Sequence, residues 1–179
     1  MRVLETKLPG VLIIEPEVFG DSRGFFKETF QAQRYREAGI EHDFVQDNHS
    51  RSQKGVLRGL HFQIAKPQGK LVSCSQGAVF DVVVDIEPLS STFGQYVGVK
   101  LSGDDHRQIW VPPGYAHGFC VLTDTADFHY KCTDYYDSSD EGGLIWNDPD
   151  VAIKWLIDQP LLSERDAKLP SLKELTNQS

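Results

Sequence analysis

KLVSCSQGAVFDVVVDI (residues 70–86) contains two runs of apolar and β-branched residues joined at a Gln-Gly turn. Runs of this kind, separated by a short glycine turn, are typical of paired β-strands. In the second run every even-numbered residue from 80 to 86 is apolar, and Asp81 shares the opposite face with Val79 and Val83. A buried carboxylate is costly unless it is paired. The stretch therefore predicts two strands, with Asp81 either in a strand-end salt bridge or orienting a histidine.

The same kind of pattern continues on both sides of this stretch. From residue 44 onward, further strand patterns alternate with turns, over residues 44–50, 56–62, 95–101, 108–112, 118–123, 128–134 and 143–146. Many short strands at close spacing predict an antiparallel sandwich or barrel, not a fold in which helices alternate with parallel strands. No repeat or linker divides the chain, so we expect one domain over residues 1–179.

The two ends of the chain carry weaker patterns. GDSRG (residues 20–24) reads as a turn between two runs that can pair. Residues 29–39 are the best helix candidate, with Thr29 as its cap, Gly39 at its end and only a thin apolar face. Residues 163–168 also have a helix-like composition. We expect short helices packed at the periphery of a β core.

Composition excludes several classes of protein. The net charge of −8 and the pI of about 5.2 argue against a nucleic-acid partner, because phosphate contacts need clustered Lys and Arg. No apolar run approaches the ~20 residues of a membrane span, and the first ten residues do not resemble a signal peptide. Three cysteines without CxxC spacing indicate reduced thiols. We therefore expect a cytoplasmic protein with no membrane partner.

VLRGLHFQ (residues 56–63) places two cationic side chains three positions apart in an apolar run. In a regular strand Arg58 and His61 fall on opposite faces, because side chains alternate with period 2. Gly59 lies between them, and glycine inside a strand often marks a bulge that changes where a side chain points. The sequence thus allows both side chains to enter one cavity.

Four of the six histidines fall into two groups. His42 and His106 lie in charged, turn-like stretches, where solvated side chains are the simplest interpretation. His61 and His117 lie in strand-like apolar settings, each close to a glycine or proline turn. A buried histidine with one hydrogen-bond partner is also common, so their position alone does not assign them a function.

Four further residues have an ordinary structural interpretation. Ser163 and Asp166 have the spacing of a helix capping box. Tyr130 has the position of a core tyrosine whose hydroxyl bonds to backbone. Lys70 follows a turn at the start of a strand, where an exposed lysine is usual.

Taken together, nine segments resemble the dTDP-4-dehydrorhamnose 3,5-epimerase family of the cupin superfamily: FGDSRGFFKE, FVQDNHS, VLRGLHFQ, QGKLV, VFDVVVDI, FGQYVGVKLS, WVPPGYAHGF, YKCTDYY and WNDP. The likeness runs in order over about residues 2 to 170. It implies an all-β, cupin-type jelly-roll barrel or sandwich and a homodimer that acts without a cofactor or metal. The substrate implied is a nucleotide sugar, dTDP-4-dehydro-6-deoxy-D-glucose, which is inverted at C3 and C5 to give dTDP-4-dehydro-L-rhamnose.

Carried over position by position, the resemblance implies a role for each matching residue. His61 matches the general base and Asp166 the acid that pairs with it, while Tyr130 matches the general acid and Lys70 the group that stabilises the enolate. Arg58 and His117 match positions beside the sugar, with Asp81 behind His117. The positions implied for the nucleotide and diphosphate are Arg23, Phe25, Glu28, Gln46, Asp47, Asn48, Tyr136, Glu141 and Arg165. A lysine ammonium beside the phenol of Tyr130 is expected to lower its pKa.

Three other functions remain open from the sequence. A metal-dependent cupin oxygenase needs three clustered protein ligands, and Gln63 stands where a second histidine of such a site would be expected. A non-catalytic binding module is disfavoured because all four residues in the catalytic positions are present. A related enzyme that inverts only one carbon is the stronger alternative, because the orientation of Tyr130 can decide the outcome.

Overall fold

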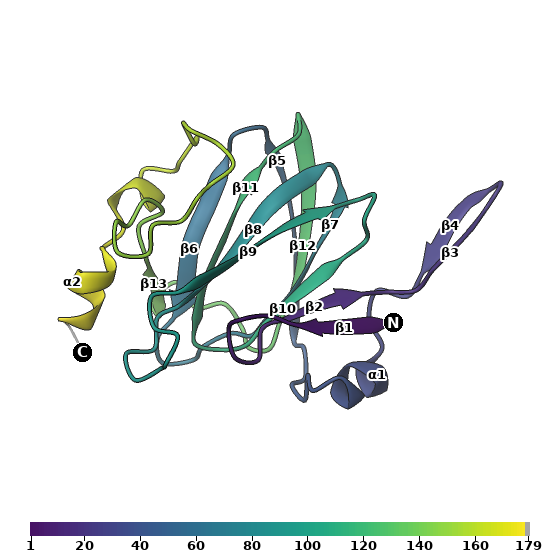
Figure 1. Ribbon diagram of the computed structural model, residues 1–179, viewed down its shortest axis with the longest axis horizontal. Helices are drawn as coiled ribbons and strands as arrows, with labels where there is room; N and C mark the ends of the chain where they lie inside the picture. Colours follow the sequence, from purple (N-terminus) through teal and green to yellow (C-terminus); the bar gives the residue numbers. More distant parts are fainter. Residues whose placement is uncertain (178–179) are drawn as a thin grey trace.

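The computed structural model describes residues 1–177, which form two antiparallel sheets facing each other, a projecting hairpin and short peripheral helices (Figure 1). The expected domain over residues 1–179 includes two residues, 178 and 179, that lie outside the described part. No helix within residues 1–177 has the length and apolar character needed to cross a bilayer. The predicted all-β architecture with short outer helices is confirmed.

The larger sheet has six strands, in the order β1 (Arg2–Glu5), β2 (Leu12–Glu15), β10 (Gln108–Val111), β7 (Lys70–Gln76), β12 (Thr125–Cys132) and β5 (Gln46–Gln53). The smaller sheet has five, in the order β13 (Glu141–Gly143), β6 (Leu57–Gln63), β11 (Tyr115–Val121), β8 (Ala78–Asp85) and β9 (Tyr96–Ser102). From β5 to β8 and from β9 to β13, successive strands alternate between the two sheets, which is the connectivity of a jelly roll.

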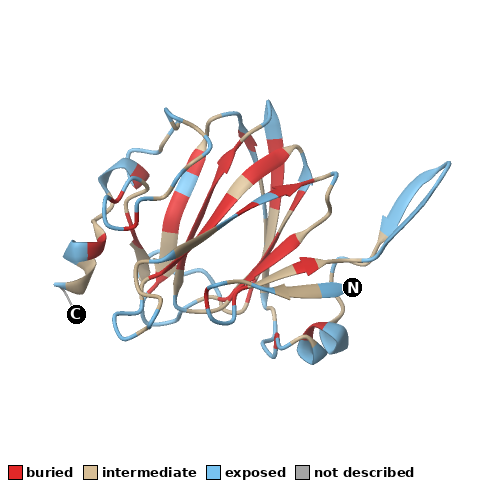
Figure 2. Ribbon diagram, in the orientation of Figure 1, coloured by how far each residue is buried: buried red, intermediate tan, exposed pale blue. Residues whose placement is uncertain are grey.

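The main core fills the space between the two sheets. Val79 and Val83 of β8 point into it from the smaller sheet, and Val72 of β7 meets them from the larger one. Phe119 and Phe128 stack across the gap, with ring centroids 3.8 Å apart. Buried residues accordingly run along the strands that face each other (Figure 2).

Both outer faces are partly covered as well. Val82 and Val84 of β8 pack under residues of the C-terminal segment, including Leu144 and Leu172. On the larger sheet, Tyr35 of α1 (Ala32–Glu37) packs against Trp110 of β10. This cover explains why both faces of the 78–86 run are apolar, since neither is left to solvent.

The strand segment 56–62 contains the predicted irregularity at Gly59. His61 pairs with His117, and Arg58 pairs with Phe119, so two residues of β6 oppose Gly118 alone. Gly59 has φ +120°, and a Cβ there would lie 2.7 Å from the Gly118 Cα. Only glycine fits such an approach between two backbones.

Several boundaries differ from the sequence prediction. Helix α1 begins after Gln31, whose side chain accepts a hydrogen bond from the Arg34 backbone N–H, so Thr29 is not its cap. The strand predicted at residues 143–146 is β13, at Glu141–Gly143. Residues 163–168 form only the 3₁₀ turn η1 (Asp166–Lys168). Helix α2 (Leu172–Thr176), with a capping box between Ser171 and Glu174, was not predicted.

The predicted hairpin at residues 20–24 is confirmed, and it leaves the body of the molecule. Strands β3 (Val18–Asp21) and β4 (Gly24–Lys27) pair only with each other. The hairpin projects away from the sheets in Figure 1 and is almost entirely exposed in Figure 2. Phe19, Phe25 and Phe26 are all exposed on it. A surface of this kind marks a site of interaction.

Candidate active site

A cavity of about 600 Å³ opens between the two sheets. Strands β6 and β11 form one wall, β7 and β12 the other, and residues 161–166 of the C-terminal segment close one side. Its lining includes nine of the site residues predicted from the sequence: Arg58, His61, Lys70, His117, Tyr130, Tyr136, Glu141, Arg165 and Asp166. Arg58 and His61 therefore share one cavity, as the Gly59 bulge predicts.

His61 and Asp166 form a close pair although 105 residues separate them in the chain. The His61 Nε2 atom lies 2.7 Å from a carboxylate oxygen of Asp166. Because an ionised carboxylate only accepts, Nε2 carries the proton, and the lone pair of Nδ1 is left to act as a base. The predicted capping box is wrong: Ser163 Oγ accepts a hydrogen bond from the Asp166 backbone N–H, but η1 follows Arg165, which makes no side-chain cap, and the Asp166 carboxylate bonds His61 and the Gly59 N–H.

The Asp166 carboxylate stays ionised despite its burial. Burial raises its pKa, but hydrogen bonds from His61, the Gly59 N–H and Ser163 outweigh that effect and leave the pKa below its ordinary value. The charge is thus held against His61, where it fixes the tautomer of the ring.

Asp81 pairs with His117, and both side chains are buried. The His117 Nε2 atom lies 2.9 and 3.0 Å from the two carboxylate oxygens. The orienting contact predicted for Asp81 is confirmed, and Asp81 lies within β8, not at a strand end. Asp85, on the same strand, accepts hydrogen bonds from Ser90 and Thr92 instead and has a structural role.

Tyr130 projects from β12 into the cavity and is partly buried. Burial raises the pKa of its phenol, the nearby Cys132 adds to the rise, and Arg58 partly opposes it. The expectation that a neighbouring lysine lowers this pKa is wrong, because desolvation outweighs the nearby cations. The phenol is therefore protonated at neutral pH.

Lys70 begins β7 and lines the cavity, so it is not an ordinary exposed lysine at a strand end. Burial lowers the pKa of its ammonium, while the nearby Cys132, Glu141 and Asp81 act to raise it. A cation in such a setting interacts strongly with any negative charge that forms in the cavity. Arg58 lines the same cavity and donates a hydrogen bond of 3.1 Å from Nε to Ser52 Oγ.

A smaller hollow adjoins the cavity and shares His61, Tyr130 and Glu141 with it. Gln46 and Asn48 of β5 line this hollow, and their side chains are joined by a hydrogen bond of 3.1 Å. The Gln46 side chain also accepts a hydrogen bond from the Tyr136 backbone N–H. Arg165 lines the main cavity and forms a salt bridge to Glu141.

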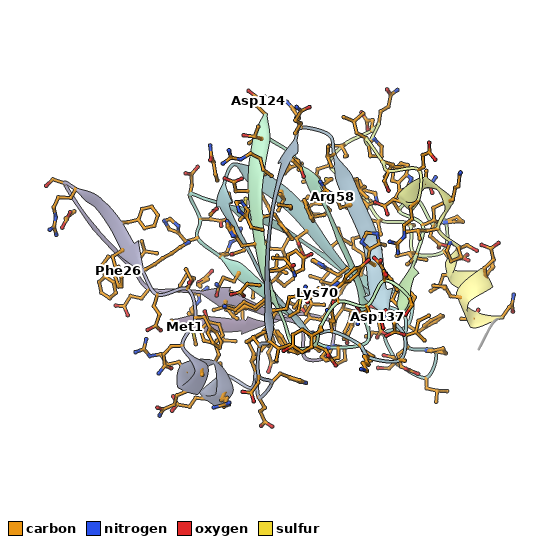
Figure 3. The ribbon with its side chains drawn as sticks, turned by 180° about the vertical axis from the view of Figure 1, so that it is seen from behind. Met1, Phe26, Arg58, Lys70, Asp124 and Asp137 are labelled. Atoms are coloured by element: carbon orange, nitrogen blue, oxygen red, sulfur yellow. The ribbon has the colours of Figure 1, made fainter. Side chains whose placement is uncertain are left out.

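Four predicted binding residues lie outside both the cavity and the adjoining hollow. Asp47 alternates to the other face of β5, where it pairs with Lys131. The other three, Arg23, Phe25 and Glu28, belong to the hairpin and its base. Arg23 forms a salt bridge with Asp21, and Glu28 forms one with Arg34. The ring of Phe25 lies against His106, with ring centroids 4.5 Å apart. Figure 3 shows the neighbouring Phe26 on the hairpin, far from Arg58 and Lys70 in the body. Within one chain, these residues and the cavity do not meet.

Some lining residues were not predicted. Ser50 lines the cavity and Ser52 holds Arg58, and both lie on the face of β5 that carries Asn48. Strand alternation starting from Asn48 was a usable signal for them. Leu161 and Leu162 also line the cavity, from a segment with no regular pattern. Within residues 1–177 there is no cluster of three or more His, Cys, Asp or Glu side chains placed to hold a metal ion.

Comparisons with known proteins agree on one family. The family model for dTDP-4-dehydrorhamnose 3,5-epimerase matches residues 5–174. The dTDP-4-dehydrorhamnose 3,5-epimerase of Shigella flexneri is 54% identical over 168 residues, which cover 93% of each chain.

Solved structures give the same result. An epimerase from Legionella pneumophila in complex with dTDP-4-keto-L-rhamnose is 55% identical, with a TM-score of 0.94 over 96% of this chain and 93% of that one. A 3'-monoepimerase from Streptomyces bikiniensis in complex with dTDP-quinovose is 34% identical, with a TM-score of 0.91 over 97% of this chain and 89% of that one.

Proposed function

The chain belongs to the dTDP-4-dehydrorhamnose 3,5-epimerase family, and we propose that its central cavity carries out the reaction of that family with His61 as base and Tyr130 as acid. The protein is an isomerase of the dTDP-rhamnose pathway. It inverts C3 and C5 of dTDP-4-dehydro-6-deoxy-D-glucose and so forms dTDP-4-dehydro-L-rhamnose. The observation that carries the residue assignment is the 2.7 Å contact between His61 and Asp166 in the cavity that Tyr130 and Lys70 also line.

Each inversion begins with removal of a proton from carbon. The C4 ketone acidifies the hydrogens on C3 and C5, and the Nδ1 lone pair of His61 takes one of them. The electrons of the broken C–H bond move to the C4 oxygen, which becomes an enolate. Asp166 stabilises the imidazolium that results, because its carboxylate lies against the opposite ring nitrogen.

The inversion ends with return of a proton to the opposite face. The Tyr130 hydroxyl donates to the same carbon and the enolate returns to a ketone. Solvent then takes the extra proton from His61 and returns a proton to Tyr130. A positioned acid or base contributes roughly 10²–10⁴ in rate, about 3–5 kcal/mol. Stabilisation of the enolate oxygen must supply a comparable share, and the buried ammonium of Lys70 is suited to it.

Exchange of hydrogen with solvent tests the assignment. In heavy water the wild type should place deuterium at both C3 and C5 of the product. His61→Ala should lose nearly all exchange, because the base for the first step is gone. Wild-type exchange in His61→Ala would show that another group is the base.

Two-carbon inversion is favoured over the one-carbon alternative. The relative from Shigella flexneri named as a 3,5-epimerase is 54% identical, whereas the 3'-monoepimerase is 34% identical. A product assay coupled to a reductase separates the two, since dTDP-rhamnose forms only when both carbons are inverted.

The nucleotide and diphosphate are proposed to bind at the rim of the cavity. Arg58 and Arg165 supply the positive charge that an anionic diphosphate requires in a protein of net charge −8. Gln46 and Asn48 offer amide groups in the adjoining hollow, and the exposed ring of Tyr136 is available for stacking on thymine.

A homodimer completes the proposed site. Arg23 and Phe25 are assigned to the nucleotide, but they lie on a hairpin that projects away from the cavity of its own chain. In a symmetric dimer each hairpin can reach the cavity of the other subunit and bury its exposed phenylalanines there.

The cytoplasm is the proposed location, because Cys74, Cys120 and Cys132 are all free thiols.

A further inference from the structure

Glu141 lies where the proposed base meets the proposed nucleotide site. It is the first residue of β13, opposite Gln63 of β6, and its side chain is only 7% exposed. Its two oxygens face different groups. Oε2 accepts hydrogen bonds from Arg165 Nη2 at 2.5 Å and from the Tyr136 hydroxyl at 2.6 Å, while Oε1 lies 3.7 Å from His61 Nδ1.

A direct contact between Glu141 and the diphosphate is unfavourable, because both are anions. The position of Oε1 points to a different role. His61 Nδ1 is the ring nitrogen that Asp166 leaves free, so the positive charge formed by proton abstraction develops on the side of the ring that faces Glu141. An opposite charge within about 4–6 Å favours the protonated form. A carboxylate therefore stands on each side of the imidazole.

We infer that Glu141 is a positioning residue that strengthens His61 as a base when the substrate diphosphate draws Arg165 away. The inference rests on the proposed role of His61. In the structure the guanidinium of Arg165 neutralises Glu141. A diphosphate binds a guanidinium with two parallel hydrogen bonds, so it competes with Glu141 for the same group. Capture of the nucleotide end then leaves more of the Glu141 charge facing the imidazole.

Arg165 is free to make this exchange. Its side chain is 51% exposed, compared with 7% for Glu141, so the arginine moves and the glutamate stays. Arg165 also precedes Asp166, which holds the other side of the His61 ring. Contact between substrate and Arg165 therefore occurs beside the backbone that positions the catalytic pair.

The other charged and titratable groups around His61 are present whether or not substrate is bound. Arg58 and Lys70 supply positive charge from β6 and β7, and Asp166 supplies negative charge from η1. His117, Tyr130 and Tyr136 complete the titratable lining. Arg165 differs from these groups, because it is exposed and its partner Glu141 faces His61. Binding of the diphosphate can therefore change the charge beside His61 through Arg165.

The pH dependence of the rate tests the inference in the full-length enzyme. The acidic limb of kcat/KM reports the free enzyme, and that of kcat reports the bound enzyme. A stronger base loses its proton at higher pH, so the wild-type limb of kcat should lie above that of kcat/KM. Glu141→Gln should move the kcat limb to lower pH by about 0.5–1 unit and reduce the separation by at least half. It should also lower kcat measured above the limb by about two- to threefold, more than it changes KM.

Three further variants keep the test decisive. Glu164→Gln removes a neighbouring exposed carboxylate and should leave both limbs unchanged. Glu141→Asp keeps the charge and should recover part of the wild-type separation. Arg165→Gln should move the acidic limb of kcat/KM to higher pH, because Glu141 then faces His61 without its arginine. This variant tests the effect of Arg165 on His61 even if Glu141→Gln fails to fold.

An increase in KM with both limbs unchanged in Glu141→Gln would overturn the inference and leave Glu141 as a nucleotide contact. Such a result would not affect the proposed function, which depends on the exchange result for His61→Ala.

Discussion

Tyr130 and Lys70 line one cavity, and burial shifts their pKa values in opposite directions. The pKa of the phenol is raised and that of the ammonium is lowered, because burial disfavours the charged form of each. As the pH rises, the Lys70 ammonium therefore loses its proton below its usual range, whereas the Tyr130 phenol keeps its proton beyond its usual range. Loss of the Lys70 proton removes the cation that stabilises the enolate.

The basic limb of the pH–rate profile should accordingly report Lys70 and lie below the ordinary lysine value of 10.5. Lys70→Arg keeps a cation with a pKa above about 12, so it should move the basic limb to higher pH. Steady-state rates measured across the pH range provide the test. A basic limb at the same pH in Lys70→Arg would contradict the assignment.

Substitution of Tyr130 should separate exchange from inversion. Tyr130→Phe removes the donor on one face and leaves His61 and Asp166 in place. We expect loss and same-face return of the proton at His61 to continue, so that deuterium enters the sugar while the configuration is retained. Lys70→Ala is the contrast, because it should slow exchange and inversion together by roughly 10²–10³. NMR of the sugar recovered from heavy water measures both.

At the scale of the strand, Gly59 is the position on which the site depends. Its φ of +120° strains any other residue, and a Cβ would lie 2.7 Å from the Gly118 Cα and 2.8 Å from the His117 carbonyl oxygen. Gly59→Ala should therefore destabilise the protein by about 2–4 kcal/mol. It should also lower activity, because the bulge brings Arg58 and His61 to the same cavity.

Gly39→Ala is a matched control for this substitution. Gly39 has φ +91°, but a Cβ at this position would have nothing within 4 Å of it. The backbone cost alone is about 1–2 kcal/mol. Chemical denaturation of both variants compares them. Equal losses of stability would show that the close approach at Gly118 does not matter.

At the scale of the whole molecule, the projecting hairpin predicts a dimer. Light scattering at micromolar concentration should give the mass of two chains of 20.2 kDa each. Phe26 is 69% exposed on the hairpin, so Phe26→Asp should leave the fold intact and favour the monomer. The monomer should bind the nucleotide more weakly, because Arg23 and Phe25 no longer reach a partner's cavity.

Mixed dimers give a sharper test of the shared site. A His61→Ala chain keeps its hairpin, and an Arg23→Ala chain keeps its catalytic pair. In a mixed dimer, the cavity of the Arg23→Ala chain receives an intact hairpin, so one site in two should regain the wild-type KM. If mixed dimers form but none of their sites regains the wild-type KM, Arg23 does not contribute to the partner's site.

Acid–base chemistry by side chains alone predicts that activity does not depend on a metal. Treatment of the purified enzyme with a strong chelator, followed by its removal, should leave kcat unchanged. Stoichiometric iron or zinc in the purified protein, together with loss of activity on its removal, would favour the metal-dependent cupin instead.

The sequence by itself determined those features that depend on near neighbours in the chain. Alternation of side chains predicted the strands, the need of Asp81 for a partner and the outer face of β8. Gly59 between Arg58 and His61 predicted the bulge. The roles assigned to individual residues came from the resemblance, since residue types in a strand pattern do not distinguish a core tyrosine from an acid.

Only the tertiary structure decided what depends on distant segments and on burial. It joined His61 to Asp166 across 105 residues and placed Glu141 at Nδ1 of the same ring. It also separated the hairpin from the cavity and raised the pKa of Tyr130. The physical reason is that periodicity reports which face of a strand a side chain occupies. What lies across that face, and how far water is excluded from it, depends on how the whole chain packs.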